Sequence, residues 1–272
     1  MAYILPDTEL LTIKQVAETG VNQATFEIEP LSPGYGVTVG NTLRRILLSS
    51  MEGAAITSVR IDGATHEFTT VPGVHEDMVN LILNMKQVKL RLHGNEPTSL
   101  VLTKKGPGAV TVADFKANSA VEFINPEQVI ANLDKGAQLN LEIEVRKGRG
   151  YSPVEARRDE KLPLGTIAID SIFSPVIRVT YDIENTRVGN VTNYDKLIMT
   201  VITDGSISPQ DALQTAAKIA VEHFSAVAGI TTNLAETETV VATAMEVTVD
   251  EDAVVAAPKK RASRKTATKE EE

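Results

Sequence analysis

Residues 34–57 read GYGVTVGNTLRRILLSSMEGAAIT, and the rest of the chain is organised around this stretch. Its apolar residues recur at three- and four-residue spacing, which predicts an amphipathic helix of about three turns over residues 39–51. The predicted apolar face consists of Val39, Leu43, Ile46 and Leu47. Leu48 widens this face, so the helix needs more than one neighbour. Asn41 or Thr42 is expected to cap its first turn, and Gly53 to form a left-handed cap after its last.

Two adjacent arginines, Arg44 and Arg45, lie in the middle of the predicted helix. One interpretation is a solvated pair that keeps the outer face of the helix in water. The other is a surface covered by a partner, because the planar guanidinium group of arginine is enriched at protein interfaces. The residue pattern by itself leaves both interpretations open.

The composition bounds the class of protein. The chain has 272 residues, no cysteine and a formal net charge of −9 at pH 7. This length suits two core-bearing domains. The negative charge argues against a nucleic-acid-binding surface spread over the whole molecule, because phosphate binding needs concentrated lysine and arginine. The absence of cysteine fits a reducing compartment, and the first residues contain no apolar run typical of a signal or membrane segment. We therefore expect a cytoplasmic protein.

The sequence contains no recognisable catalytic pattern. Its four histidines are scattered, without the spacing of a metal-binding motif. No serine-nucleophile elbow is present, nor a cluster of aspartates for the paired magnesium ions of nucleotidyl transfer. The glycine-rich segment 34–40 follows neither the P-loop nor the dinucleotide-binding pattern. We expect no catalytic, metal-binding or cofactor-binding residues on this chain.

The middle of the chain, residues 54–175, is predicted to be rich in β-strands. An Asp-Gly pair separates two short runs, which predicts a hairpin between residues 55–61 and 64–68. A second helix is predicted over residues 74–86. The segment LNLEIEVR at 139–146 alternates apolar and polar residues and predicts a strand with one buried face.

A second long amphipathic pattern begins at Ser208, the expected N-cap, and is predicted to end at Gly229. Alanines in its apolar stripe allow another helix to approach closely. The stripe consists of Leu213, Ala216, Ala217, Ala220, Phe224 and Val227. Packing within the chain and association of two copies of the chain both fit this pattern.

Two charge-rich segments interrupt or follow these patterns. Residues 147–163 are either a linker or a docking loop. Beyond residue 232 the charges separate into an acidic stretch, 236–252, and a basic stretch, 258–269. This separation predicts a disordered tail over residues 233–272. The basic stretch is either a solubilising tail or a weak, non-specific DNA contact.

Several blocks of this sequence resemble the alpha subunits of bacterial DNA-directed RNA polymerase, in their amino-terminal domain. The signature helix of that family is similar to VTVGNTLRRILLSSMEGAAIT at 37–57. Further similar blocks are VHEDMVNLILNMK at 74–86, GRGY at 148–151, SPVIRVTYDIENTRVGNVTNYDKL at 174–197 and TDGSISPQDALQTAAKIAVEHF at 203–224. The resemblance covers about residues 1–232 and is far more specific than any single motif.

This resemblance implies a fold and a function. The fold is α+β, with a discontinuous dimerisation domain made of two helices and a sheet (1–53 and 176–232), a β-rich inserted domain (54–175) and the charged tail. The function is that of a non-catalytic subunit of a nucleotidyltransferase, a homodimeric assembly scaffold that recruits the beta and beta-prime subunits for transcription. Omega and sigma are implied as further members of the holoenzyme.

The resemblance also implies roles for individual residues. The contacts to beta are Arg44, Arg45, Leu48 and Lys86. The contacts to beta-prime are Val176, Arg178, Arg187 and Lys196. The dimer interface consists of the apolar faces of the two helices, namely Val39, Leu43, Ile46, Leu47, Leu213, Ala216, Ala217, Ala220, Phe224 and Val227.

The sequence departs from the family pattern at two places. Val191 stands where the family commonly has a basic residue, and the charged tail stands where members usually continue into a compact helical domain that binds promoter DNA. We therefore expect normal assembly without domain-based reading of promoter elements. The alternative from another class is a free-standing homodimeric ligand-binding α+β protein that uses the glycine-rich segment 34–40 as its loop.

Overall fold

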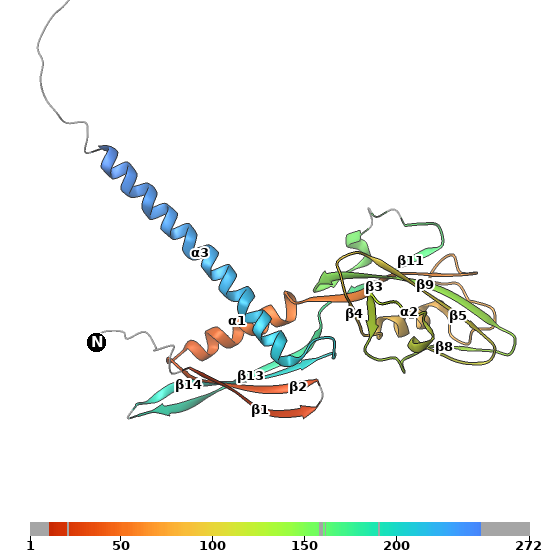
Figure 1. The fold of residues 1–272 in the computed structure, drawn as a ribbon, viewed down its shortest axis with the longest axis horizontal. Helices are drawn as coiled ribbons and strands as arrows, with labels where there is room; N and C mark the ends of the chain where they lie inside the picture. Colours follow the sequence, from red (N-terminus) through yellow and green to blue (C-terminus); the bar gives the residue numbers. More distant parts are fainter. Residues whose placement is uncertain (1–10, 21, 158–159, 161, 190, 246–272) are drawn as a thin grey trace, which may run out of the picture. The chain divides into compact units, whose positions relative to one another are not determined.

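The computed structural model of the protein describes residues 11–245 except 21, 158, 159, 161 and 190. These residues form an α+β fold with mostly antiparallel sheets, as the sequence predicts (Figure 1). The α-helices of the described part are α1 (Tyr35–Ser49), α2 (Met78–Lys86) and α3 (Pro209–Met245). The described residues up to His223 form one compact unit, and a second unit begins at Phe224 within α3.

The first sheet combines the first two strands of the described chain with its last two strands. Its strands are β1 (Thr12–Gly20), β2 (Gln23–Leu31), β13 (Val176–Val188) and β14 (Val191–Thr203), in the antiparallel order β1-β2-β14-β13. The first two strands, β1 and β2, pair as an antiparallel hairpin. One face of the sheet is apolar and packs with α1 and the start of α3. The buried residues of this first core include Phe26, Ile28, Leu43, Leu47, Leu197, Met199, Val201, Leu213 and Ala216.

A second core is built from the middle of the chain. Its main sheet has the order β11-β3-β9-β5, with strands β3 (Glu52–Ile61), β5 (Thr98–Lys105), β9 (Gln138–Arg149) and β11 (Thr166–Ala168). Smaller pairs are β4 (Leu90–Leu92) with β7 (Val121–Phe123), β6 (Gly108–Thr111) with β8 (Val129–Leu133), and β10 (Tyr151–Ser152) with β12 (Ser171–Ile172). Helix α2 buries Met78, Leu81 and Met85 in this core. The predicted alternation along β9 is confirmed, because every second residue from Leu139 to Val145 is buried.

The predicted ends of the first helix are wrong at both sides. Helix α1 begins at Tyr35, so Asn41 and Thr42 lie inside it and cap nothing. Its N-cap is Gly34, which has a left-handed backbone (φ +85) and no side chain to cap with. The helix ends at Ser49, and Gly53 belongs to β3 rather than to a left-handed cap.

Two predictions in the middle of the chain also need correction. The expected hairpin strand 64–68 does not form. Strand β3 already has β9 on one side and β11 on the other, so a returning strand finds no free edge beside Arg60. Helix α2 begins at Met78 rather than Val74, because the carboxylate of Asp77 accepts a hydrogen bond from the Asn80 amide (2.9 Å) and caps the helix there.

Helix α3 begins as predicted but does not end as predicted. The Ser208 hydroxyl accepts a hydrogen bond from the Asp211 amide (3.1 Å), which confirms it as the N-cap. Gly229 keeps a helical backbone, and the helix continues to Met245. A single glycine costs a helix only about 1 kcal/mol relative to alanine, which does not suffice to end it. The predicted tail thus overlaps α3 over residues 233–245, and its remainder, including the basic stretch, lies outside the described residues.

Candidate subunit interfaces

Helix α1 is held on the first sheet by its glycines. The buried carboxylate of Asp195, on β14, accepts hydrogen bonds from the amides of Gly34 (2.9 Å) and Gly36 (3.0 Å). A carboxylate at a helix N-terminus satisfies free amides and opposes the positive end of the helix dipole. A side chain at Gly40 would meet the ring of Tyr181 at 2.8 Å. The glycine-rich segment therefore serves close packing, and two of its amides are already bound within the chain.

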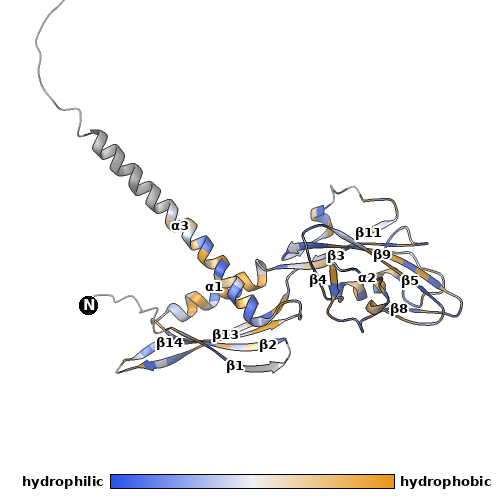
Figure 2. Cartoon of the chain, in the orientation of Figure 1, coloured by the Kyte–Doolittle hydropathy of each residue, from blue (hydrophilic) through white to orange (hydrophobic). Residues whose placement is uncertain are grey.

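The apolar residues of α1 divide into buried and half-buried ones. Leu43 and Leu47 are buried in the first core, with Leu47 fully enclosed. Val39 and Ile46 are half-buried and pack at the border of that core. The sequence predicted all four as one face, and the structure buries two of them and leaves the other two half-buried. Figure 2 shows that both hydrophobic and hydrophilic residues occur along α1.

The outer side of α1 carries the residues expected to contact beta. Arg44 and Arg45 are exposed, and within the described residues neither guanidinium has a hydrogen-bond or ion-pair partner. Leu48 is also exposed, at 37%. This side therefore combines two unpaired cations with an exposed apolar side chain.

Helix α3 changes from buried to exposed along its length. Leu213 and Ala216 belong to the first core, and Ala216 has no exposed surface. Ala217 is exposed and Ala220 is half-buried. Three large apolar side chains then follow at three-residue spacing, each more than half exposed; they are Val221, Phe224 and Val227. Val221 was not among the predicted interface residues, although its apolar side chain and spacing would have indicated it.

Lys86, the remaining residue expected to contact beta, ends α2. Its ammonium group lies 3.0 Å from the carboxylate of Asp170. Asp170 also accepts a hydrogen bond from the Val154 amide (2.9 Å), and these two interactions lower the pKa of its carboxyl group. Lys86 is thus held in place and remains partly exposed.

The residues expected to contact beta-prime are spread along the β13–β14 hairpin. Val176 is buried in the first core, while Arg178 is exposed near the same end. Arg187 lies about 30 Å further along the strand and donates a hydrogen bond to the Gly189 carbonyl. The ammonium group of Lys196 contacts the Glu27 carboxylate at 2.9 Å, and this hydrogen bond raises the pKa of Lys196. The hairpin does not gather these four residues into one cluster.

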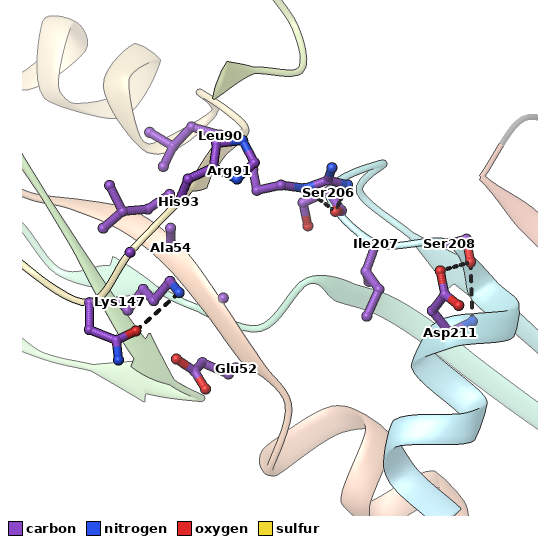
Figure 3. A pocket seen from close by; sticks show the side chains of 14 residues that line it. Glu52, Ala54, Leu90, Arg91, His93, Lys147, Ser206, Ile207, Ser208 and Asp211 are labelled. Atoms are coloured by element: carbon purple, nitrogen blue, oxygen red, sulfur yellow. Dashed lines mark hydrogen bonds between the residues drawn. The ribbon is translucent and has the colours of Figure 1, made fainter. Parts of the chain in front are cut away.

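A groove of about 770 Å³ lies where the second core meets the loop before α3. Arg91, on β4, extends across it in Figure 3, and its Nε donates a hydrogen bond to the Ser206 carbonyl (2.7 Å). Nearby, a side chain on Gly205 would lie 3.0 Å from Ile124. Cations lining the groove have partners within the chain, including Lys147 with the amide oxygen of Asn95 (3.3 Å). The groove thus marks where Arg91 ties the two cores together.

Among the described residues, no cluster of three or more histidine, aspartate or glutamate side chains is arranged to hold a metal ion. No helix in the described part of the chain is both long and apolar enough to cross a membrane.

Comparison with known proteins identifies the family. A family model described as the RNA polymerase Rpb3/RpoA insert domain matches residues 59–174, which contain most of the second core. The DNA-directed RNA polymerase subunit alpha of Symbiobacterium thermophilum is 53% identical over 213 residues, or 78% of this chain and 68% of the relative. Those of Alkaliphilus oremlandii (216 residues, 79% of this chain and 68% of the relative) and Oceanobacillus iheyensis (226 residues, 83% and 71%) are each 50% identical.

These identities confirm the resemblance drawn from the signature helix and the four later blocks. The identities also argue against the alternative of a free-standing ligand-binding protein. The glycine-rich segment, which would be the binding loop in that alternative, donates two amide hydrogen bonds to Asp195. The chain belongs to the family of DNA-directed RNA polymerase alpha subunits, and so to the multi-subunit nucleotidyltransferase that carries out transcription.

Proposed function

We propose that this chain is the assembly scaffold of the polymerase, a homodimer that recruits the beta and beta-prime subunits and contributes no catalytic residue. One observation carries the proposal: α1 and α3 present exposed apolar side chains and two unpaired arginines that the described chain leaves uncovered. Arginine and large apolar residues dominate binding energy at protein interfaces.

The dimer contact that we propose is narrower than the sequence predicted. Four of the predicted residues are buried in the first core and anchor the two helices there, namely Leu43, Leu47, Leu213 and Ala216. Two separate surfaces are left for a second copy: the half-buried border of α1, with Val39 and Ile46, and the exposed stripe along α3. The residues of this stripe are Ala217, Ala220, Val221, Phe224 and Val227. Isologous pairing would place the same stripe on both partners.

Replacing Phe224 by aspartate should separate the dimer without unfolding the chain. Phe224 is 63% exposed, so its loss leaves the two cores intact, while an unpaired carboxylate in an apolar seam costs on the order of 3 kcal/mol. This cost corresponds to a dimer dissociation constant about 100-fold higher. Light scattering on a sizing column would measure the mass. Ser225→Asp, at the adjacent exposed position, is the matched control and should remain dimeric. A dimeric Phe224→Asp variant would refute this seam.

Replacing Arg45 by alanine should weaken binding to beta while the dimer persists. The Arg45 guanidinium is exposed and has no partner in the described residues, so its removal breaks no contact of the folded chain. Truncation of an interface arginine typically costs about 2 kcal/mol, or roughly 30-fold in affinity. Titration of purified beta into the dimer measures this change. Arg178→Ala, another exposed arginine, serves as control, and equal affinities of the two variants would count against Arg45.

The remaining assignments follow from the same proposal. Lys86 joins Arg45 in the contact with beta, and the β13–β14 hairpin contacts beta-prime at separate points along its length. The spread of Arg178, Arg187 and Lys196 along this hairpin supports a long, shallow contact rather than one pocket. We place the scaffold in the cytoplasm with the rest of the enzyme.

A further inference from the structure

We propose that Tyr151 and Ile172 form the apolar centre of the surface that binds beta, with Arg45 at one border and Lys86 at the other. This inference rests on the proposed scaffold function and adds two residues that the sequence pattern did not indicate. Tyr151 lies in residues 147–163, for which the sequence left two interpretations open, a linker or a docking loop. With Tyr151 at the surface that binds beta, this segment is a docking loop.

The two side chains lie beside each other on a small exposed ribbon. Tyr151 on β10 pairs directly with Ile172 on β12, so their side chains project from the same face. Tyr151 is 60% exposed and Ile172 is 57% exposed. An aromatic and a β-branched side chain in this arrangement form an apolar patch that a soluble protein rarely leaves uncovered.

This patch is continuous with the outer side of α1. The Ser174 hydroxyl donates a hydrogen bond to the Leu48 carbonyl (3.3 Å), which ties the segment after β12 to the end of α1. A side chain on Gly150 would lie 3.4 Å from the Ser49 carbonyl oxygen, so the residue before Tyr151 also lies against this helix end. Exposed Leu48 therefore borders the ribbon, and Arg44 and Arg45 lie one turn further along.

Lys86 also borders the patch. Asp170, which directly precedes β12, holds the Lys86 ammonium group at 3.0 Å and the Val154 amide at 2.9 Å. One carboxylate therefore fixes the position of Lys86 relative to both strands of the ribbon. The apolar centre therefore has a fixed cation, Lys86, beside the strand that carries Ile172.

Side chains next to the ribbon anchor it to the second core. The guanidinium group of Arg157 donates hydrogen bonds to the carbonyl oxygens of Thr57 and Ile169, which pins the segment after Tyr151 to the second core. Arg146 contacts both carboxylate oxygens of Glu160 (3.0 and 3.1 Å). A ribbon anchored in this way loses little conformational entropy on binding, so its apolar side chains contribute more fully to affinity.

The chemistry of the surface indicates its occupant. An apolar centre requires an apolar segment opposite, and the unpaired guanidinium groups of Arg44 and Arg45 require carboxylates beside that segment. The segment of beta that binds here is therefore apolar and is flanked by acidic residues. The exposed apolar side chains of Tyr151 and Ile172 at the centre favour a protein segment over the phosphate backbone of a nucleic acid.

Titration of beta into the wild-type dimer and single variants tests the inference. Tyr151→Ala and Ile172→Ala should each weaken binding about tenfold or more, with unchanged dimer mass and circular dichroism. Tyr151→Phe keeps the ring and should bind within about twofold of wild type, which separates ring packing from misfolding. Phe68→Ala removes another exposed aromatic of the second core region and is the matched control.

The outcomes separate this inference from the proposed function. If Arg45→Ala weakens binding while Tyr151→Ala and Ile172→Ala both bind as wild type, the scaffold stands and the apolar centre is refuted. If wild type does not bind beta at all, the proposed function fails and the inference falls with it. Calorimetry adds a second readout, because loss of the apolar centre should make the heat-capacity change of binding less negative.

Discussion

Replacing Gly53 by alanine should lower the free energy of unfolding by about 3 kcal/mol or more, although the change adds one methyl group. A Cβ atom at Gly53 would lie 1.9 Å from the carbonyl oxygen of Phe173 and 3.3 Å from the ring of Pro175. The obstacle is backbone, so no rotamer change relieves the contact, and overpacking of this kind ranks among the costliest single changes.

The position of Gly53 explains why the whole region would respond. Gly53 pairs with Gly148 across β3 and β9, and the buried ring of Phe173 packs directly on Gly148. Urea unfolding followed by circular dichroism measures the effect. Gly20→Ala is the control, because Gly20 has no neighbouring atom within 4 Å of its Cβ position. Equal midpoints for the two variants would contradict the close approach of Phe173.

The second large effect concerns Ala216 on α3. Ala216→Glu should unfold the first core, since Ala216 has no exposed surface and its neighbours in that core are apolar. A buried carboxylate without a partner costs several kcal/mol, on the order of the total stability of a domain. The family resemblance implied that Ala216 lies in the dimer interface, where the same substitution would instead break the dimer.

Ala217→Glu is the matched test, since the same charge enters at the next, exposed position. We expect this variant to fold with near-normal circular dichroism and to dimerise less tightly. Thermal unfolding and sizing-column mass together distinguish the two outcomes. A folded, monomeric Ala216→Glu protein would return Ala216 to the dimer seam and refute its place in the core.

The parts of the fold that the sequence predicts well are those determined locally. Ser208 caps α3 through an amide three residues away, and the alternation along β9 follows from one buried face, so both can be found within a short window. The start of α1 could not be found in this way. The free amides at its start are bound by the carboxylate of Asp195, which lies about 160 residues later in the chain, and glycines at 34 and 36 otherwise disfavour a helix.

The candidate interfaces show the same division. The outer position of Arg44, Arg45 and Leu48 follows from helical periodicity, and the structure exposes all three. Periodicity could not separate Leu47, which is fully buried, from Ile46, which is half-buried, because both belong to one apolar stripe. Tyr151 and Ile172 escaped notice because their pairing joins segments separated by about twenty residues and a charged loop. The only local signal was an aromatic residue directly after a glycine.

The first sheet contains strands that are synthesised early (β1 and β2) and strands that are synthesised late (β13 and β14). This sets the order in which the two cores can form during protein synthesis. The second core draws its buried residues from positions 56–169 and is complete before β13 leaves the ribosome. Helix α1, by contrast, lacks the hydrogen bonds from its first amides to Asp195 until β14 has emerged, on the order of ten seconds after α1 itself at bacterial elongation rates. Throughout that interval Leu43 and Leu47 face water, so a nascent chain presents this helix to chaperones before it can present it to a second subunit.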